Sequence, residues 1–181
     1  GTLFTDVSRS FYEIRGKRIG IVGMGAIGTG VARVAEAFGM EVVYYSTSGT
    51  GHCKEWPSIS FEELMRTSDV ISIHAPYNER TAGLIGEAEL AMMKPTAIIV
   101  NMGRGGIVDE EALAQAIDND SIGGAALDVF AREPLQGDSP LLRTRHPEKL
   151  RFTPHTAWAS VEARTRLINC IADNIRTEMG L

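Results

Sequence analysis

The stretch Lys17-Arg18-Ile19-Gly20-Ile21-Val22-Gly23-Met24-Gly25-Ala26-Ile27-Gly28 decides the fold of this chain. A short apolar run ends at Val22, the glycines Gly23, Gly25 and Gly28 follow with the spacing GxGxxG, and a segment of helical period begins at Ile27. In this context Gly23 permits a tight turn, Gly25 lets the backbone approach a pyrophosphate, and Gly28 lets the helix pack closely against the strand. The unpaired amides at the helix start then face the anion. The stretch therefore favours a dinucleotide-binding turn over an ordinary connection between a strand and a helix.

Short β-rich runs and segments of helical period alternate along the rest of the chain. The expected strands are 19–22, 41–45, 69–74, 97–101, 124–127 and 151–153. The expected helices are 27–38, 61–67, 87–93, 108–119 and 161–179, and the apolar stripe of the last helix should pack against another surface. This alternation predicts the α/β class, with a Rossmann-type doubly wound parallel sheet and helices on both faces.

Composition limits the partners that this chain can have. The 181 residues include 18 Lys+Arg and 23 Asp+Glu, a net charge of −5, which argues against a nucleic-acid partner. Charged residues interrupt every apolar run well before the roughly 20 residues that a membrane span needs. Cys53 and Cys170 lie far apart, so we expect two reduced thiols in a cytoplasmic protein and no metal site.

The second expected strand ends in Tyr45-Ser46-Thr47-Ser48. A carboxylate at this place would accept hydrogen bonds from the ribose hydroxyls of NAD. Here hydroxyl side chains replace the carboxylate, and no arginine stands in the run to attract the 2′-phosphate of NADP. The sequence therefore favours NAD over NADP only narrowly.

Three polar residues follow different strands, at the edge of an open α/β sheet where ligands bind. Arg104 lies in Asn101-Met102-Gly103-Arg104-Gly105-Gly106, Glu133 precedes Pro134, and His155 follows Pro154. Each residue taken singly has an ordinary explanation as a solvated loop or capping residue. Their joint placement after separate strands favours a common site.

At these residues the chain closely resembles the NAD(P)-binding domain of the D-isomer-specific 2-hydroxyacid dehydrogenases. The matching motifs are the glycine turn, His74-Ala75-Pro76, the run from Asn101 to Asp109, Leu127-Asp128-Val129, Glu133-Pro134 and Pro154-His155. Several long motifs in one order are far more specific than the glycine turn alone.

The resemblance implies hydride transfer between D-2-hydroxy acids and 2-keto acids, with NAD as the coenzyme and NADP still open. It assigns His155 as the acid/base, Glu133 as the partner of its imidazole, and Arg104 as the anchor of the substrate carboxylate. Trp158 would close the pocket or belong to the core. The implied coenzyme-binding residues are Gly23, Gly25, Ala26, Ile27, Ser46, Thr47, His74, Ala75, Pro76, Thr81, Met102, Gly103, Arg104, Asp128 and His155.

The resemblance also implies a domain plan. Residues 1–181 would form the dinucleotide-binding domain, with 1–14 as a crossover from a substrate domain that is largely absent from this chain. We therefore expect the isolated chain to bind dinucleotide and to reduce 2-keto acids poorly. A homodimer is expected, with residues 4–12 contributing to its interface.

Two other classes of protein remain possible at this point. One is an NAD(H)-sensing interaction module of the corepressor type, which would bind NADH tightly without turnover. The other is a methyltransferase, which shares the glycine turn and has no need for the pair of His155 and Glu133. The substrate acid stays open among glycerate/hydroxypyruvate, lactate/pyruvate and bulkier pairs.

Overall fold

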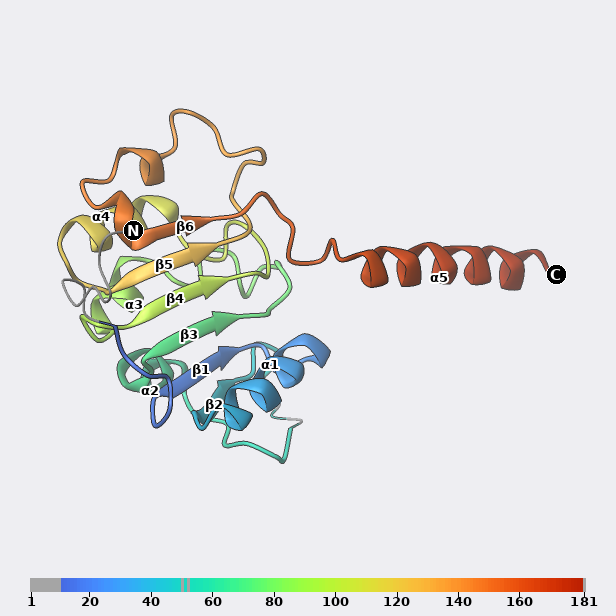
Figure 1. Cartoon of the computed structure of the whole chain (residues 1–181), viewed down its shortest axis with the longest axis horizontal. Coiled ribbons are helices and arrows are strands. Elements are labelled where there is room, and N and C mark those ends of the chain that lie inside the picture. Colours follow the sequence, from blue (N-terminus) through green and yellow to red (C-terminus); the bar gives the residue numbers. More distant parts are fainter. Residues whose placement is uncertain (1–10, 50, 52, 181) are drawn as a thin grey trace, which may run out of the picture.

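The chain folds around one six-stranded sheet in which all neighbouring strands are parallel. The computed structural model describes residues 11–49, 51 and 53–180. The strands are β1 (Arg18–Val22), β2 (Glu41–Tyr45), β3 (Val70–Ile73), β4 (Ile98–Asn101), β5 (Gly124–Leu127) and β6 (Leu150–Phe152). They lie in the order β2-β1-β3-β4-β5-β6 (Figure 1). The direction of the strand order therefore changes between β1 and β3, and the carboxyl ends of these strands form the crevice where such sheets bind ligands.

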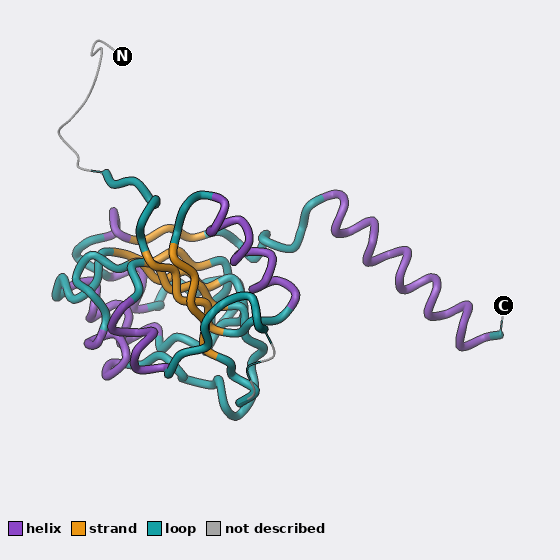
Figure 2. Tube along the Cα trace, turned by 90° about the horizontal axis from the view of Figure 1, so that it is seen from below, coloured by secondary structure: helices purple, strands orange, loops and turns teal. Residues whose placement is uncertain are grey.

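Helices lie on both sides of the strands, as expected (Figure 2). Helix α1 (Ala26–Ala37) packs on one face, whereas α2 (Phe61–Thr67), α3 (Glu87–Met92) and α4 (Glu110–Asp118) pack on the other. Side-chain caps fix two of the helix starts. The amide of Glu63 donates to Ser60 Oγ over 3.1 Å, and the amide of Ala112 donates to Asp109 Oδ1 over 2.9 Å. Because Asp109 is the capping residue, α4 begins two residues later than the sequence pattern predicts.

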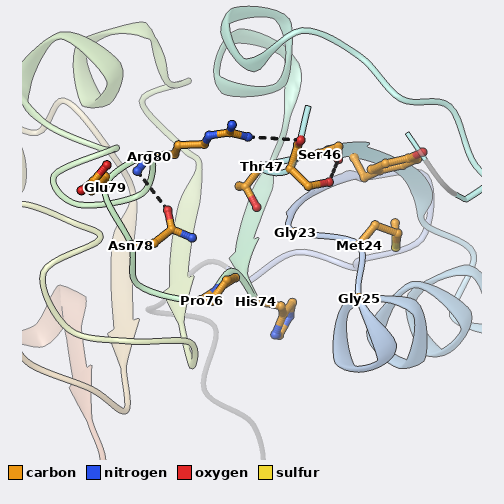
Figure 3. A pocket seen from close by; sticks show the side chains of 12 residues that line it. Gly23, Met24, Gly25, Ser46, Thr47, His74, Pro76, Asn78, Glu79 and Arg80 are labelled. Atoms are coloured by element: carbon orange, nitrogen blue, oxygen red, sulfur yellow. Dashed lines mark hydrogen bonds between the residues drawn. The ribbon is translucent and has the colours of Figure 1, made fainter. Parts of the chain in front are cut away.

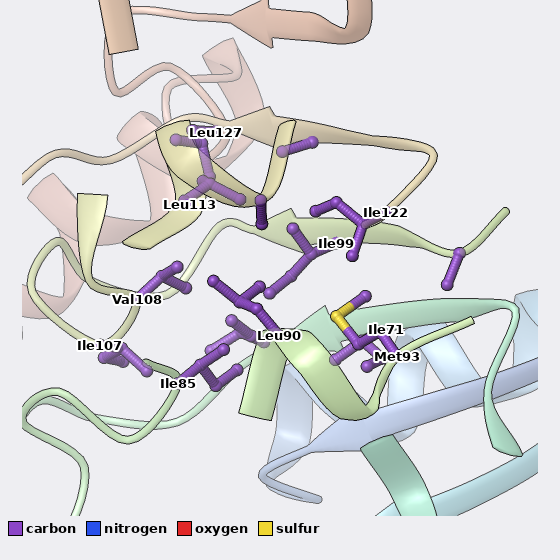
Figure 4. Packing of buried hydrophobic residues seen from close by; sticks show 14 of the residues in the cluster. Ile71, Ile85, Leu90, Met93, Ile99, Ile107, Val108, Leu113, Ile122 and Leu127 are labelled. Atoms are coloured by element: carbon purple, nitrogen blue, oxygen red, sulfur yellow. The ribbon is translucent and has the colours of Figure 1, made fainter. Parts of the chain in front are cut away.

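The larger core lies between the sheet and α2, α3 and α4 (Figure 4). Ile71, Ile99, Leu90 and Leu113 are all at most 1% exposed there. A smaller core beneath α1 joins residues of β1 and β2 to small helix residues such as Ala32. The central strands are apolar on both faces, which is typical of a parallel sheet covered from both sides.

The α1 side of the sheet is only partly covered by the described chain. Helix α1 lies over β1 and β2, while Ile98 on β4 is 43% exposed and Val100 is half-buried. The expected crossover segment 1–14 lies mostly outside the described residues, and its described part, 11–14, has no regular secondary structure. Residues 4–10 of the expected dimer contact are likewise outside them, and Phe11 and Tyr12 are exposed.

The C-terminal part of the chain departs from the sequence-based expectation. Two short 3-10 helices, η1 (Pro140–Arg143) and η2 (Pro147–Lys149), which the periodicity did not predict, connect β5 to β6. Helix α5 (Val161–Met179) projects away from the sheet, and none of its residues is buried (Figures 1 and 2). The predicted packing of its apolar stripe is therefore wrong within the described chain: Ile168 and Ile171 are 65% and 50% exposed. An apolar period identifies a face but does not specify the surface that covers it.

No helix in the described part of the chain combines the length and hydropathy needed to cross a membrane. No group of three or more His, Cys, Asp or Glu side chains is arranged there to hold a metal ion. Cys53 and Cys170 are both free thiols.

Candidate functional site

The glycine turn between β1 and α1 has the geometry that its sequence predicts. Gly23 has a φ of +94°, and a Cβ there would lie 2.9 Å from the amide nitrogen of Ala75. A Cβ on Gly28 would lie 2.3 Å from the carbonyl oxygen of Gly23, so helix and turn pack too closely for any side chain. Gly25 faces open space and caps α1 without a side-chain hydrogen bond. The turn therefore leaves room for a ligand beside the first amides of α1.

A first cleft of about 790 Å³ lies above this turn, at the carboxyl ends of β1, β2 and β3 (Figure 3). It is bounded by the glycine turn, by the hydroxyl residues that follow β2, and by the loop that follows β3. Its lining residues are Gly23, Met24, Gly25, Tyr44, Ser46, Thr47, Ser48, His74, Pro76, Asn78, Glu79 and Arg80.

The loop after β3 is held by its own side chains. The hydroxyl of Thr81 donates to the carbonyl oxygen of Pro76 over 2.6 Å and accepts from the amide of Asn78 over 2.9 Å. The side-chain oxygen of Asn78 accepts from the amide of Arg80 over 2.9 Å. Thr81 is fully buried and does not line the cleft, contrary to the coenzyme contact expected for it. Its hydroxyl is already committed to bonds within the loop.

His74 lies where the first cleft meets a second one. It follows β3, and its Nε2 lies 2.8 Å from Ser72 Oγ. Burial lowers the pKa of His74, which favours the neutral imidazole. His74 lines both clefts, so the two adjoin at this ring. The second cleft measures about 810 Å³ and is lined by Ile27, Val31, His74, Met102, Arg104, Asp128, His155, Ala157 and Trp158.

His155 and Glu133 form a close pair at the edge of the second cleft. His155 Nδ1 lies 2.7 Å from Glu133 Oε2, and Glu133 Oε1 accepts from the amide of Phe130 over 3.0 Å. The hydrogen bond with His155, followed by that from Phe130, lowers the pKa of Glu133, so this carboxylate is ionised at neutral pH. An ionised carboxylate only accepts, and therefore His155 Nδ1 carries the donated proton. The pair fixes the orientation of the imidazole.

Asp128, which directly follows β5, holds the loop that carries His155. Its Oδ1 accepts from Thr153 Oγ over 2.5 Å and from the amide of Thr156 over 2.8 Å, and its Oδ2 accepts from the amide of Ala157 over 2.9 Å. Burial tends to raise the pKa of Asp128, but these hydrogen bonds outweigh burial and lower it. Asp128 as a whole is only 2% exposed. It is thus a charged acceptor at the centre of the His155 loop.

Arg104 is positioned by a buried asparagine at the end of β4. The side-chain amide of Asn101 donates to the carbonyl oxygen of Arg104, and its side-chain oxygen accepts from the amide of Gly103, both over 3.0 Å. The guanidinium of Arg104 donates to the carbonyl oxygen of Gly103 over 2.8 Å and lines the second cleft. A planar guanidinium therefore shares this cleft with the imidazole of His155.

The structure gathers most of the residues singled out in the sequence into the two clefts. The first receives Gly23, Gly25, Ser46, Thr47, His74 and Pro76, and the second receives Ile27, His74, Met102, Arg104, Asp128, His155 and Trp158. Glu133 lines a neighbouring apolar pocket of about 420 Å³ that shares His155. Besides Glu133, the predicted site residues that line neither cleft are Ala26, Ala75, Thr81 and Gly103.

Several lining residues are not among the site residues implied by the sequence. They are Met24, Tyr44, Ser48, Asn78, Glu79 and Arg80 in the first cleft, and Val31 and Ala157 in the second. Only the strand order could have indicated Arg80, because it brings the loops after β2 and β3 to the two sides of β1.

Known proteins resemble this chain over most of its length. Residues 4–157 match the family model of the D-isomer specific 2-hydroxyacid dehydrogenase, NAD binding domain. A glyoxylate reductase of Aeropyrum pernix is 45% identical over 166 residues, which cover 90% of this chain and 49% of that protein. The chain spans about half the length of the curated relatives that it matches.

Two solved structures are similar over nearly the whole chain. The acyclic imino acid reductase Bsp5, in complex with NADPH and D-Arg, has a TM-score of 0.85 and 36% identity, covering 93% of this chain and 53% of that one. D-lactate dehydrogenase from Aquifex aeolicus, complexed with NAD and lactic acid, has a TM-score of 0.86 and 28% identity, covering 97% and 57%. With the family model matching most of its length, this chain belongs to the D-isomer specific 2-hydroxyacid dehydrogenase family, of which it carries the NAD-binding domain.

Proposed function

We propose that this chain is the coenzyme-binding half of an oxidoreductase that interconverts D-2-hydroxy acids and 2-keto acids. The observation that carries the proposal is that His155, paired with Glu133 over 2.7 Å, lines a cleft that also holds Arg104 and adjoins the glycine-turn cleft at His74. Family membership supports the same reaction.

The residues of the two clefts fit a nicotinamide dinucleotide. The open backbone at Gly25 and the first amides of α1, from Ala26 and Ile27, suit a pyrophosphate. Ser46 and Thr47 would bind the adenosine ribose, beside a wall formed by His74 and Pro76 with Ala75 behind it. Met102, Asp128 and the backbone around Gly103 would lie along the nicotinamide. Thr81 is not retained, because its buried hydroxyl is bonded within its loop.

The second cleft supplies what the reaction demands of the protein. A 2-keto acid brings a carboxylate and a carbonyl, and the planar fork of Arg104 can hold both. The bound coenzyme supplies the hydride. His155 gives a proton to the carbonyl oxygen during reduction and takes it back during oxidation. Glu133 accepts from Nδ1 and so directs the opposite ring nitrogen toward the substrate.

The test uses the full-length protein that contains this chain. Reduction of glyoxylate, hydroxypyruvate and pyruvate is followed with NADH and with NADPH. Loss of general acid–base catalysis in His155→Asn should lower kcat by a factor of about 10² to 10⁴. His146→Asn is the matched control, because His146 forms a similar pair with Glu148, over 3.2 Å, outside both clefts.

Two results would contradict the proposal. If His155→Asn keeps kcat within about tenfold of the parent, the imidazole is not the acid/base. Tight NADH binding with no turnover of any 2-keto acid would instead support the sensing module of the corepressor type. The isolated 181-residue chain should bind coenzyme and reduce these acids poorly.

We further propose a cytoplasmic homodimer without nucleic-acid or membrane partners. The two free thiols support the cytoplasmic location, and the net charge of −5 supports the absence of a nucleic-acid partner. The uncovered sheet face around Ile98 supports association. Sedimentation equilibrium of the full-length protein tests the dimer, and a concentration-independent monomer mass would refute it.

A further inference from the structure

A cation from a distant part of the sequence closes one end of the first cleft. The guanidinium Nη1 of Arg80 donates to the carbonyl oxygen of Ser48 over 3.3 Å, although 32 residues separate the two. Figure 3 shows the side chain of Arg80 reaching across the cleft toward the residues that follow β2. Ser46 Oγ and Ser48 Oγ lie 3.1 Å apart on that side. The guanidinium therefore lies against the hydroxyl run that ends β2.

The position of Arg80 is built into its loop. Its amide donates to Asn78 Oδ1, and Asn78 is in turn bonded to the buried Thr81. These bonds set the direction in which the arginine leaves the backbone. A guanidinium carries five N–H donors, so the bond to Ser48 anchors the group and leaves capacity for an anion.

The charges around this end of the cleft favour a phosphate over a bare ribose. NAD-binding sites of this fold place a carboxylate after the second strand to accept from the 2′-hydroxyl. Here Ser46 and Thr47 occupy that place. Glu79 also lines the cleft, but Figure 3 shows its carboxylate on the far side of Arg80 from the hydroxyl run. A 2′-phosphate would meet there the hydroxyl side chains and a guanidinium, which binds phosphate through charge-assisted hydrogen bonds.

We propose that Arg80, together with the hydroxyls of Ser46, Thr47 and Ser48, binds the 2′-phosphate of NADP(H). Arg80 is then a specificity-determining residue, and the chain binds NADP(H) more tightly than NAD(H). The inference rests on the proposed function only in that the first cleft holds the adenosine half of the coenzyme. It requires nothing of the hydride chemistry at His155.

Calorimetric titration of the full-length protein with two fragments isolates this end of the site. The probes are 2′,5′-ADP, which carries the phosphate, and 5′-AMP, which lacks it. Charge-assisted bonds to one phosphate predict that 2′,5′-ADP binds at least about tenfold more tightly. NADPH and NADH should differ in the same direction.

Variants locate the source of the difference. Arg80→Ala should remove most of the preference for 2′,5′-ADP and change the affinity for 5′-AMP by less than about twofold. Arg80→Lys should keep part of it, because lysine retains the charge without the planar fork. Arg66→Ala is the matched control, since Arg66 is an exposed arginine on α2 paired with Glu62. Ser46→Asp should weaken NADPH binding and favour NADH.

The outcomes separate this inference from the proposed function. Equal affinities of the parent protein for 2′,5′-ADP and 5′-AMP overturn the inference. So does an Arg80→Ala variant that loses affinity for both probes equally, because Arg80 would then support the adenosine and not the phosphate. Binding and turnover of NADH with no tighter binding of NADPH refutes this inference alone. Failure of both coenzymes to bind refutes the proposed function as well.

Discussion

Replacing Asp128 by asparagine should destabilise the protein strongly, because the side chain keeps its shape but loses its charge. The carboxylate accepts from the amides of Thr156 and Ala157 on separate oxygens, and from the hydroxyl of Thr153. An asparagine can offer only one acceptor oxygen. Its least costly orientation turns the amide nitrogen toward Ala157, so that two N–H donors face each other.

The magnitude follows from these contacts. The lost bond and the unpaired donors cost about 1–3 kcal/mol. The remaining bonds fall to roughly half their strength when their acceptor becomes neutral. We therefore expect a loss of about 3 kcal/mol, or roughly 6–12 °C in Tm for a chain of this size. Urea unfolding at pH 7 measures it, with Asp173→Asn on exposed α5 as a control that should stay within about 0.5 kcal/mol.

Acid provides a second arm of this experiment. The folded-state pKa of Asp128 is lowered from its ordinary value of 3.8, so its stabilising contribution is present above that value. The contribution disappears as pH falls through the folded-state pKa, because the Asp128 carboxylate of the parent is then protonated and uncharged, like the asparagine of the variant. The difference in unfolding free energy between parent and Asp128→Asn should therefore narrow below pH 3.8. A gap below about 0.5 kcal/mol at pH 7, or one unchanged down to pH 3, would refute the reasoning.

Three further predictions concern packing and burial. A Cβ on Gly105 would lie 1.8 Å from the carbonyl oxygen of Phe130, so Gly105→Ala should lose about 1–3 kcal/mol of unfolding free energy in urea. Gly30 has open space around it in α1, so Gly30→Ala should gain about 0.5–1 kcal/mol. Changes of the same sign in the two variants would contradict this prediction. Burial lowers the pKa of His74 below 6.5, so as pH falls the unfolded chain takes up this proton first, and the unfolding free energy should decrease from pH 7.5 to 5. The unfolding free energy of His74→Gln should decrease less over the same range. An identical pH dependence in parent and variant would exclude His74 as the cause. Ile168→Ala on α5 should change the unfolding free energy by no more than about 0.5 kcal/mol, and a larger loss would mean that this exposed stripe is packed in solution.

The parallel sheet could be predicted from the sequence because its information is local. Strands buried on both faces become continuous apolar runs, and Gly23 and Gly28 are required by contacts within one turn. The grouping of Arg104, Glu133 and His155 could be predicted for a related reason. Residues that follow parallel strands meet at one edge of the sheet, whatever the connections between them.

The remaining features depend on contacts that no local pattern records. Arg80 reaches Ser48 only because β1 lies between β2 and β3, and its own sequence neighbours resemble any solvated turn. The hydroxyl of Thr81 does not face the cleft, because it hydrogen-bonds to Pro76 and Asn78 within its own loop. Helix α5 has the apolar period of a packed helix without a covering surface in the described chain.

The two ends of the first cleft differ in how freely they can mutate. Beside its glycine turn, a methyl group added to Gly28 would collide with the backbone of the turn, so this part of the proposed coenzyme site cannot change without damaging the fold. Ser48 and Arg80 lie at the surface, where substitutions cost little stability. If Arg80 sets the coenzyme preference as we propose, that preference can change in evolution or by engineering while the glycine turn stays intact.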